Sequence, residues 1–319
     1  MTTTAPPAAI ALSRLRKSYG DKVVLDGVDL LVSEGTVFAL LGPNGAGKTT
    51  MVNILSTLIR PDGGEVKVAG HDVVAEPDAV RAAIGVTGQF SAVDNLLTGE
   101  ENLVLMARLH HLTRSQEQSR VAELLERFEL LESANQPPAT YSGGMRRRLD
   151  LAMGLVGSPR IVFLDEPTTG LDPRGRHTMW QAIRDLASEG VTIFLTTQYL
   201  EEADRLADRI ALLDGGRLVA QGTPEELKRL APGGHIRLRF TDPADLESAA
   251  GVLDAVNRDD QQLALHVASD GRVRSIRSVL DRLEHESIEA DSLTIHTPDL
   301  DDVFFALTGH ATTEEEATS

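Results

Sequence analysis

One eight-residue motif, Gly42 to Thr49, constrains the fold of this chain more than any other feature. It reads Gly-Pro-Asn-Gly-Ala-Gly-Lys-Thr and matches the phosphate-loop pattern G-x-x-x-x-G-K-[ST]. The apolar run Val37 to Leu41 precedes it and a helical pattern, Lys48 to Leu58, follows it. Glycines let backbone N–H groups converge on phosphate oxygens, and the following helix contributes its positive N-terminal end. The motif therefore predicts a nucleotide site between a strand and a helix.

The side chains of this loop have separate predicted roles. Lys48 is placed to reach the β- and γ-phosphates, and the hydroxyl of Thr49 is placed to ligate Mg²⁺. A glycine-rich turn that matches by chance is the alternative, at about one in a hundred for a chain of this size. The candidate nucleotide-binding residues are Gly42, Pro43, Asn44, Gly45, Ala46, Gly47, Lys48, Thr49 and the adjacent Thr50.

Short apolar runs alternate with longer helical patterns in the first two thirds of the chain. Ile161 to Leu164 and Val191 to Thr196 are typical of buried strands, and Leu200 to Ala207 is typical of a helix. This alternation predicts an α/β fold with a parallel sheet and ligands at the carboxyl ends of its strands. Residues 95–155 read as helical throughout and predict a helical subdomain inserted into that core. The predicted acidic face of the helix after the third run comprises Glu201, Glu202 and Asp204.

The second chemical signal is a pair of carboxylates at the end of an apolar strand. Asp165 and Glu166 follow Ile161 to Leu164, and Pro167 ends the strand because it cannot donate to a ladder. Asp165 is predicted to hold Mg²⁺ through water, and Glu166 to orient the attacking water or accept its proton. Such a pair alone is often only a strand end, but beside a phosphate loop it predicts a nucleotide hydrolase.

A third motif, Tyr141 to Met145, stands between these two. Ser142 is the predicted N-cap of a helix, with Gly143 and Gly144 behind it, so the chain holds a second anion-binding helix terminus. Ser142 lies 142 − 48 = 94 residues after Lys48 and 165 − 142 = 23 residues before Asp165. For the run Arg146 to Arg148 that follows, we favour a solvated or partner-contacting face over a phosphate clamp.

Charge divides unevenly along the chain. The net charge is 31 − 48 = −17, of which residues 1–230 carry −6 and residues 231–319 carry −11. The turn-forming segment Leu230 to Gly234 marks the change. We therefore predict a nucleotide-binding domain over residues 11–230 and an accessory or assembly domain over residues 235–310. Residues 1–10 and 311–319 are predicted to be disordered tails.

Composition excludes several classes of function. Without cysteine, the chain has no disulfide, Cys-ligated zinc or thiol nucleophile. Its net negative charge argues against a nucleic-acid partner. Its longest clear apolar run, Val37 to Leu41, is far shorter than the ~20 residues of a membrane span. The first residues also lack the basic region of a secretory signal, so we expect a cytoplasmic protein.

Together and in this order, the three motifs resemble those of the ATP-binding subunit of an ABC transporter. Residues 10–230 carry the resemblance, although Tyr141 and Met145 depart from the first and last positions of the LSGGQ signature. The resemblance implies ATP and Mg²⁺ as cofactors, and a P-loop cassette with a mainly parallel sheet core. It also implies an antiparallel β-subdomain, the helical subdomain and a small C-terminal α+β appendage.

The resemblance assigns roles to residues outside the three motifs. Tyr19 would stack on adenine, and Gln89 would sense Mg²⁺ and couple the site to a membrane subunit. Asp172, in Gly170 to Asp172, would belong to the loop that bridges paired subunits. Taken without their neighbours, these residues are better explained as an aromatic before a turn, a solvated amide and a turn former.

Three longer segments narrow the resemblance to the daunorubicin/doxorubicin-resistance (DrrA-type) branch. They are Tyr141 to Arg148, Thr196 to Asp204 and Leu300 to His310. This branch implies one half of a drug or lipid efflux pump in actinobacteria, peripheral to the cytoplasmic face of the membrane. Its partner would be a separate ABC-2 type permease (DrrB-like), and its cargo an anthracycline-like amphiphile or a lipid.

One departure from most of the family concerns the residue after the third strand, Gln198, where a histidine is usual. Glutamine both donates and accepts hydrogen bonds, as a neutral histidine does, but it does not change charge near neutral pH. We interpret Gln198 as a functional substitution that still contacts the γ-phosphate and the opposite subunit. Glu166 and Gln198 are the two predicted catalytic residues.

The family mechanism implies a homodimer. Each chain would hold ATP between its own phosphate loop and the Ser142 terminus of a second copy, and hydrolysis would release the pair. Three alternatives stay open: a soluble ABC ATPase acting on ribosomes or DNA, an ATP-binding regulatory subunit without a transport role, and a metal-dependent kinase. The kinase is least favoured because it does not need Ser142 to Gly144.

Overall fold

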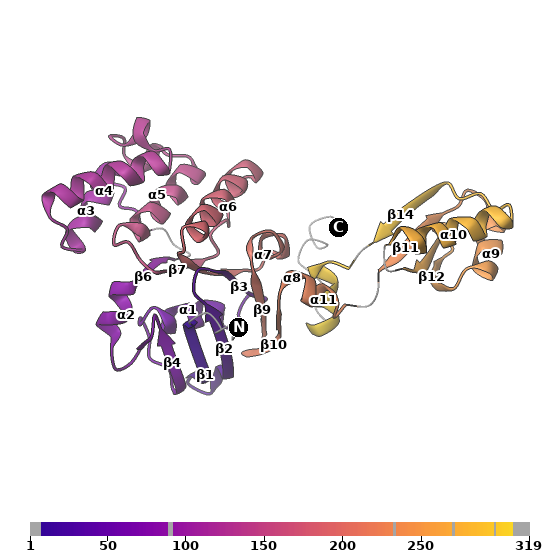
Figure 1. Ribbon diagram of the computed structural model, residues 1–319, viewed down its shortest axis with the longest axis horizontal. Coiled ribbons are helices and arrows are strands. Elements are labelled where there is room, and N and C mark those ends of the chain that lie inside the picture. Colours follow the sequence, from indigo (N-terminus) through magenta and orange to yellow (C-terminus); the bar gives the residue numbers. More distant parts are fainter. Residues whose placement is uncertain (1–7, 89–91, 232–233, 270–271, 297, 309–319) are drawn as a thin grey trace, which may run out of the picture. The chain divides into compact units, whose positions relative to one another are not determined.

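The structure is a computed structural model that describes residues 8–88, 92–231, 234–269, 272–296 and 298–308 (Figure 1). The chain divides into two compact units, Met1–Pro224 and Glu225–Ser319. Across the described ranges, no helix is both long and apolar enough to cross a membrane.

A six-stranded sheet forms the centre of the first unit, in the order β10-β9-β3-β8-β7-β6. Strands β3, β6, β7, β8 and β9 pair in parallel, and β10 joins the edge antiparallel to β9. Residues of β3, β7 and β8 are buried throughout, as expected for a parallel sheet covered on both faces. The strands are β3 (Val37–Leu41), β6 (Ile84–Thr87), β7 (Ile161–Asp165), β8 (Thr192–Thr197), β9 (Arg209–Asp214) and β10 (Arg217–Gly222).

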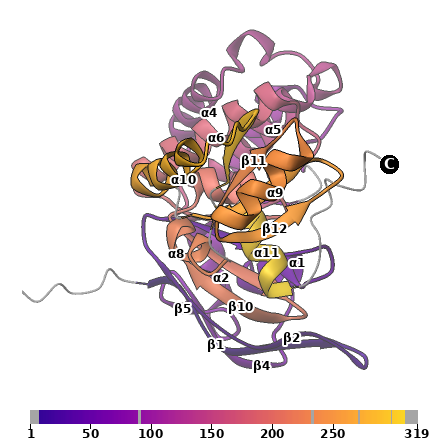
Figure 2. The ribbon, with the colours of Figure 1, turned by 90° about the vertical axis from the view of Figure 1, so that its right-hand side faces the viewer.

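A second, antiparallel sheet packs against the first across a shared core. Its strands are β1 (Ala8–Tyr19), β2 (Lys22–Ser33), β4 (Gly63–Val68) and β5 (His71–Asp72). Figure 2 shows them together at the lower edge of the view. Helix α1 (Lys48–Leu55) is part of the same core, and α2 (Pro77–Ala83) leads into β6. Phe38 and Phe194 stack in the centre with ring centroids 5.5 Å apart. This sheet is the β-subdomain that the resemblance implied.

The predicted N-terminal tail is partly wrong. Strand β1 begins at Ala8, and Ala9 and Ile10 are buried against the antiparallel sheet, so residues 8–10 belong to the core. Ile10 pairs with Val32 on one side and Val68 on the other, which accounts for its burial. The rest of that predicted tail, residues 1–7, lies outside the described residues.

The helical insertion is confirmed. In the described part of residues 95–155 there are three α-helices and no strand: α3 (Gly99–Leu109), α4 (Arg114–Arg127) and α5 (Gly143–Leu155). Thr98 and Thr113 begin α3 and α4 with full capping boxes, closed by Glu101 and Gln116. Helices α6 (Pro173–Ser188) and α7 (Leu200–Leu206) follow β7 and β8 and cover the central sheet beside the insertion (Figure 1).

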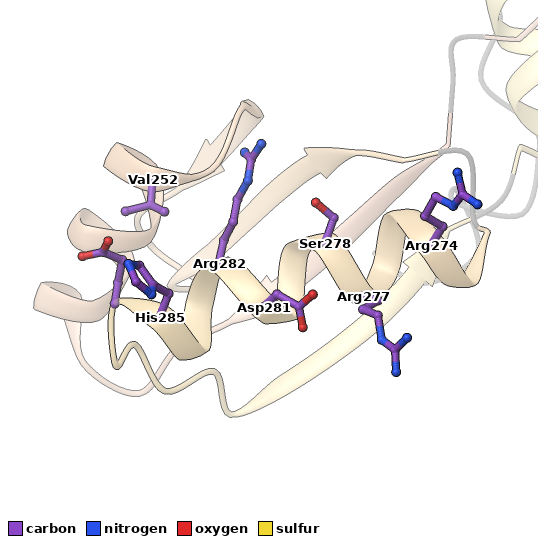
Figure 3. Close-up of a pocket in the computed structure, with 8 residues that line it drawn as sticks. Val252, Arg274, Arg277, Ser278, Asp281, Arg282 and His285 are labelled. Atoms are coloured by element: carbon purple, nitrogen blue, oxygen red, sulfur yellow. The ribbon is translucent and has the colours of Figure 1, made fainter.

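The C-terminal unit begins at Glu225, slightly before the predicted boundary, and includes all of α8 (Pro224–Lys228) except its first residue. Its antiparallel sheet has the order β12-β13-β11-β14. Helices α9 and α10 pack with this sheet around Ile236, Leu238 and Leu265. A hollow of about 620 Å³ lies along α10 (Figure 3). The elements are β11 (His235–Arg239), α9 (Pro243–Val252), β12 (Ala255–Asp259), β13 (Ala264–Ala268), α10 (Val273–His285), β14 (Ser292–His296) and α11 (Leu300–Thr308). The predicted acidic tail, residues 311–319, lies outside the described residues.

Candidate functional site

The phosphate loop connects the end of β3 to the start of α1, as the sequence predicted. Two of its glycines are required by close approach. A Cβ at Gly42 would lie 2.2 Å from the carbonyl oxygen of Leu213, and one at Gly47 would lie 2.9 Å from Leu25 and from the Val24 carbonyl. Gly47 also has φ +111°, a left-handed conformation that side chains disfavour. Because glycine has no side chain, no side-chain cap occupies the N-terminal end of α1.

Lys48 is the buried cation of this loop, with only 5% of its side chain exposed. Its ammonium donates to the carbonyls of Gly42 at 2.7 Å and Pro43 at 3.1 Å. The Glu166 carboxylate lies 4.0 Å away. Burial lowers the pKa of Lys48, whereas the charges of Glu166 and Asp165 oppose that shift. The ammonium is thus held by two loop carbonyls, with the carboxylate of the predicted catalytic Glu166 beside it.

A hollow of about 350 Å³ collects most of the predicted phosphate-binding residues with the predicted catalytic glutamate. It is lined by Asn44, Gly45, Gly47, Lys48, Thr49, Thr50 and Glu166, together with Lys22 and Val24 of β2. Gly42, Pro43 and Ala46 shape the loop behind this lining: the first two hold Lys48, and the N–H of Ala46 donates to the Pro43 carbonyl at 3.2 Å. The structure thus gathers the predicted phosphate-binding residues around one hollow, with Glu166 beside them.

The carboxylates at the end of β7 are held in two different ways. Asp165 is buried and accepts a hydrogen bond from the hydroxyl of Thr196 on β8. Glu166 has φ +49°, which is left-handed, and its N–H donates to the Thr196 carbonyl at 3.1 Å. A non-glycine residue in that region costs about 1–3 kcal/mol and persists only where the surroundings fix it. Glu166 is thus turned out of the strand towards Lys48 at a cost in backbone strain.

The oxygen ligands near the phosphate loop suit Mg²⁺ better than a metal ion that is coordinated by protein side chains alone. Across the described residues, no group of three or more His, Cys, Asp or Glu is arranged to hold a metal ion. The loop provides instead the exposed hydroxyl of Thr49, and the strand end provides the Asp165 carboxylate. Mg²⁺ is usually bound by one or two protein oxygens, waters and substrate phosphates, so this sparse set suits it. Gln89, the third predicted metal residue, lies outside the described residues.

The predicted signature forms a separate site. Ser142 caps α5 by accepting from the N–H of Met145 at 3.2 Å, and Asp172 caps α6 by accepting from the N–H of Gly175 at 2.6 Å. Both line a second hollow, of about 420 Å³, with Gly143, Gly144 and Gly170. The two hollows share no lining residue. One chain therefore carries a phosphate loop and a signature terminus that do not meet.

Tyr19 and Gln198 also stand outside both hollows. Tyr19 is 51% exposed at the end of β1, with the Lys17 ammonium 5.5 Å from its ring centroid. The structure does not bring it into the phosphate-loop hollow, where Lys22 and Val24 of the next strand lie instead. Gln198 is half-buried directly after β8, beside the strand end that carries Asp165 and Glu166.

The interpretation of the arginine run is wrong for Arg147. Its side chain is only 11% exposed and forms an ion pair of 3.1 Å with the buried Asp150. It also donates to backbone carbonyls at both sides of Glu166. The signal in the sequence was Asp150 itself, because a carboxylate three residues on, in an apolar part of the helix, indicates a buried partner.

The predicted acidic face of α7 is wrong for Glu202, which is 1% exposed. Glu202 accepts from the hydroxyl of Thr168 at 2.9 Å and from the indole N–H of Trp180 at 3.2 Å. Burial raises the pKa of this carboxyl group. Helical spacing was the missed signal: Glu202 lies four residues before the buried Leu206, on the apolar side of the helix.

Comparison with known proteins places these features in context. The family model "ABC transporter" matches residues 25–169. The daunorubicin resistance ATP-binding protein DrrA3 of Streptomyces coeruleorubidus is 48% identical over 97% of this chain and 98% of its own length. The doxorubicin resistance ATP-binding protein DrrA of Mycobacterium tuberculosis is 46% identical over 94% of this chain and 93% of its own length.

A solved ATP-binding cassette is similar to the first unit. It is described as a dimer in a post-hydrolysis state bound to ADP and Pi. The match has a TM-score of 0.61 and 28% identity, and covers 67% of this chain and 98% of the other. That protein is thus an experimental case in which this cassette fold binds the products of ATP hydrolysis.

Proposed function

The chain belongs to the daunorubicin/doxorubicin-resistance family of ABC transporter ATP-binding subunits, and we propose that it works as a homodimer with two ATP molecules buried between the copies. As a member of this family it is an ATP hydrolase that energises an efflux transporter. We also propose which residues of this chain bind and hydrolyse ATP, how two copies pair, and which cargo is exported.

The observation that carries the proposal is the separation of the two hollows. The phosphate-loop hollow has Lys48 and Glu166, and the signature hollow has Ser142 and Asp172, with no residue in common. Each provides one half of a nucleotide site. A second copy placed head to tail would set its Ser142 terminus against the γ-phosphate held by the first copy. ATP would then hold the dimer together, and hydrolysis would release it.

Within each composite site, this chain's residues divide the work. The loop N–H groups and Lys48 would hold the phosphates, and Glu166 would orient the attacking water and accept its proton. Thr49 and Asp165 would hold Mg²⁺, which when bound neutralises charge on the phosphates. Gln198 would contact the γ-phosphate from the end of β8. By the family resemblance, Gln89 would join the metal site and Tyr19 the adenine, although Tyr19 lies outside the hollow.

The relatives suggest the membrane partner and the cargo. These relatives are named for resistance to daunorubicin or doxorubicin, so we propose an anthracycline-like amphiphile as cargo, with a lipid as the second candidate. The cargo path would lie on a separate ABC-2 type permease, with this chain on the cytoplasmic face of the membrane. Drug sensitivity of cells that express the chain with and without that permease tests the transport role. Unchanged sensitivity in both would favour a soluble or regulatory ABC ATPase.

The catalytic assignment is tested by Glu166→Gln, which keeps the shape of the side chain and removes its basicity. We expect hydrolysis to fall about 100-fold or more, because general-base catalysis contributes about that much. ATP affinity should stay within about threefold, since the phosphate loop is intact. Size-exclusion chromatography with ATP should show a trapped dimer, which the wild type does not accumulate. Normal turnover by this variant would refute the role of Glu166.

A further inference from the structure

Arg147, five residues after the Ser142 cap, lies at the centre of a buried hydrogen-bond network. Its Nε donates to the Pro167 carbonyl at 2.9 Å, and one terminal nitrogen donates to the carbonyls of Asp165 at 3.1 Å and Glu166 at 3.3 Å. The other terminal nitrogen donates to the Gly88 carbonyl at 2.9 Å and to Asp150 at 3.1 Å. One guanidinium thus contacts three consecutive carbonyls around the catalytic glutamate.

The backbone at Glu166 is held by two different elements, β8 and the signature helix α5. On one side, the Thr196 carbonyl and hydroxyl accept from the N–H of Glu166 at 3.1 and 3.3 Å. On the other side, Arg147 binds the carbonyls of residues 165, 166 and 167. Glu166 has φ +49°, and a strained conformation of this kind needs fixed neighbours on both sides. Arg147 supplies one of the two.

Asp150 extends the same network. Its carboxylate pairs with Arg147 and accepts from the N–H of Ala92 at 3.1 Å, while Arg147 holds the Gly88 carbonyl. Burial lowers the pKa of Arg147, and the charges of Asp150 and Asp165 oppose that shift. The pair joins the signature helix α5 to the ends of both β6 and β7.

We propose that Arg147 is a positioning residue for ATP hydrolysis: from the signature helix it fixes the backbone at Glu166 and so aims that carboxylate. The inference rests on the proposed role of Glu166. Arg147 lines neither hollow, so it does not contact the nucleotide in this arrangement. Its substitution should therefore lower kcat and leave the KM for ATP nearly unchanged. Because the guanidinium belongs to α5, a shift of the signature helix would also move the catalytic backbone.

The test compares Arg147→Lys with Arg120→Lys. Lysine keeps the charge but donates from a single point, so it cannot bind carbonyls in three directions. Arg120 is a matched control in α4: it is 20% exposed, pairs with Glu123 three residues on, and donates to the Leu155 carbonyl. Both variants remove a guanidinium from a partly buried ion pair, but only Arg147 reaches the catalytic strand end.

We expect Arg147→Lys to lower kcat about 10- to 100-fold with KM within about threefold, since small displacements of a catalytic group have effects of that size. Arg120→Lys should keep kcat within about twofold. Arg147→Ala should have a lower kcat than Arg147→Lys, because the lysine ammonium still makes part of the contacts with the carbonyls. Wild-type kcat in Arg147→Lys, with or without a lower Tm, would overturn the inference. If neither Arg147 variant folds, Asp150→Asn, which weakens the same network, should lower kcat in the same way, and unchanged kcat would overturn it.

Glu166→Gln, measured alongside, separates the two claims. If it hydrolyses ATP normally, the proposed role of Glu166 fails, and the positioning role of Arg147 fails with it. If it is inactive while Arg147→Lys is normal, only the positioning role of Arg147 fails. The chain's one tryptophan, Trp180, gives a further readout, because it donates to Glu202, which holds Thr168 in the same loop as Glu166. Its emission should change in Arg147→Lys and not in Arg120→Lys, and an unchanged spectrum in Arg147→Lys would count against a shift of that loop.

Discussion

The two hollows of the first unit differ in how the helices that border them begin. In the phosphate-loop hollow, helix α1 begins at a glycine without a side-chain cap, and the buried Lys48 lies beside it. In the signature hollow, α5 and α6 are capped by their own side chains, Ser142 and Asp172. An uncapped helix with a lysine attracts phosphate strongly, whereas a helix satisfied by its own hydroxyl attracts it weakly. ATP should therefore bind first to the phosphate loop and only then recruit the second copy.

The largest effect is expected when the cation is removed from the phosphate-loop hollow. Lys48→Met keeps the volume of the stem and removes the ammonium. We expect the ATP affinity of the monomer to fall about 100-fold, the scale of losing a charged hydrogen-bonding group from a buried site. Isothermal titration calorimetry measures it. The matched variant is Ser142→Asp, which keeps an N-cap but adds a negative charge to the signature hollow. Its monomer affinity should be unchanged, and a loss equal to that of Lys48→Met would contradict the order of binding.

A smaller effect is expected at Gln198, at the end of the strand beside the catalytic carboxylates. Gln198→Ala removes both the donor and the acceptor, and we expect kcat to fall about 10- to 100-fold. Gln198→His restores both and should hydrolyse ATP at a rate near that of the wild type. A phosphate-release assay at saturating ATP measures both. Equal rates for the wild type and the alanine variant would remove Gln198 from the site.

The smallest effect concerns Glu202, which anchors the loop between the two hollows through Thr168. Burial raises the pKa of Glu202 above its ordinary value of 4.5, so at a pH just above that value the folded state holds a proton that the unfolded state has released. Wild-type stability therefore falls as pH rises above about 4.5, by at most about 1.4 kcal/mol per pH unit, until Glu202 also ionises in the folded state. Glu202→Gln keeps the acceptor and removes the charge.

The difference in stability between Glu202→Gln and the wild type should thus be near zero below pH 4.5, the ordinary pKa of a glutamate, and should widen as pH rises. Urea unfolding at several pH values measures the gap. Glu201→Gln, on the exposed face of the same helix, is the control and should show no such trend. A gap that does not depend on pH would mean that Glu202 is not a buried acid in solution.

The parts predicted from the sequence are those fixed by local pattern. The phosphate loop, the strand before Asp165 and the cap at Ser142 each depend on residues within one turn or strand, and the structure has them at those positions. Arg147 and Glu202 were misplaced because contacts with distant strands and loops decide their burial. The strand at residues 8–10 was missed for a similar reason, since Ile10 is buried by Val32 and Val68.

The head-to-tail site is the central claim, and mixing two defective chains tests it most directly. Both carry Glu166→Gln to trap the dimer; one adds Lys48→Met and the other Ser142→Asp. A heterodimer then has one composite site with both defects and one with an intact loop and an intact signature. We predict that neither chain dimerises alone with ATP, whereas the mixture forms a 1:1 dimer with one ATP in sedimentation analysis. Absence of a dimer in the mixture, or dimerisation of either chain alone, would contradict the account.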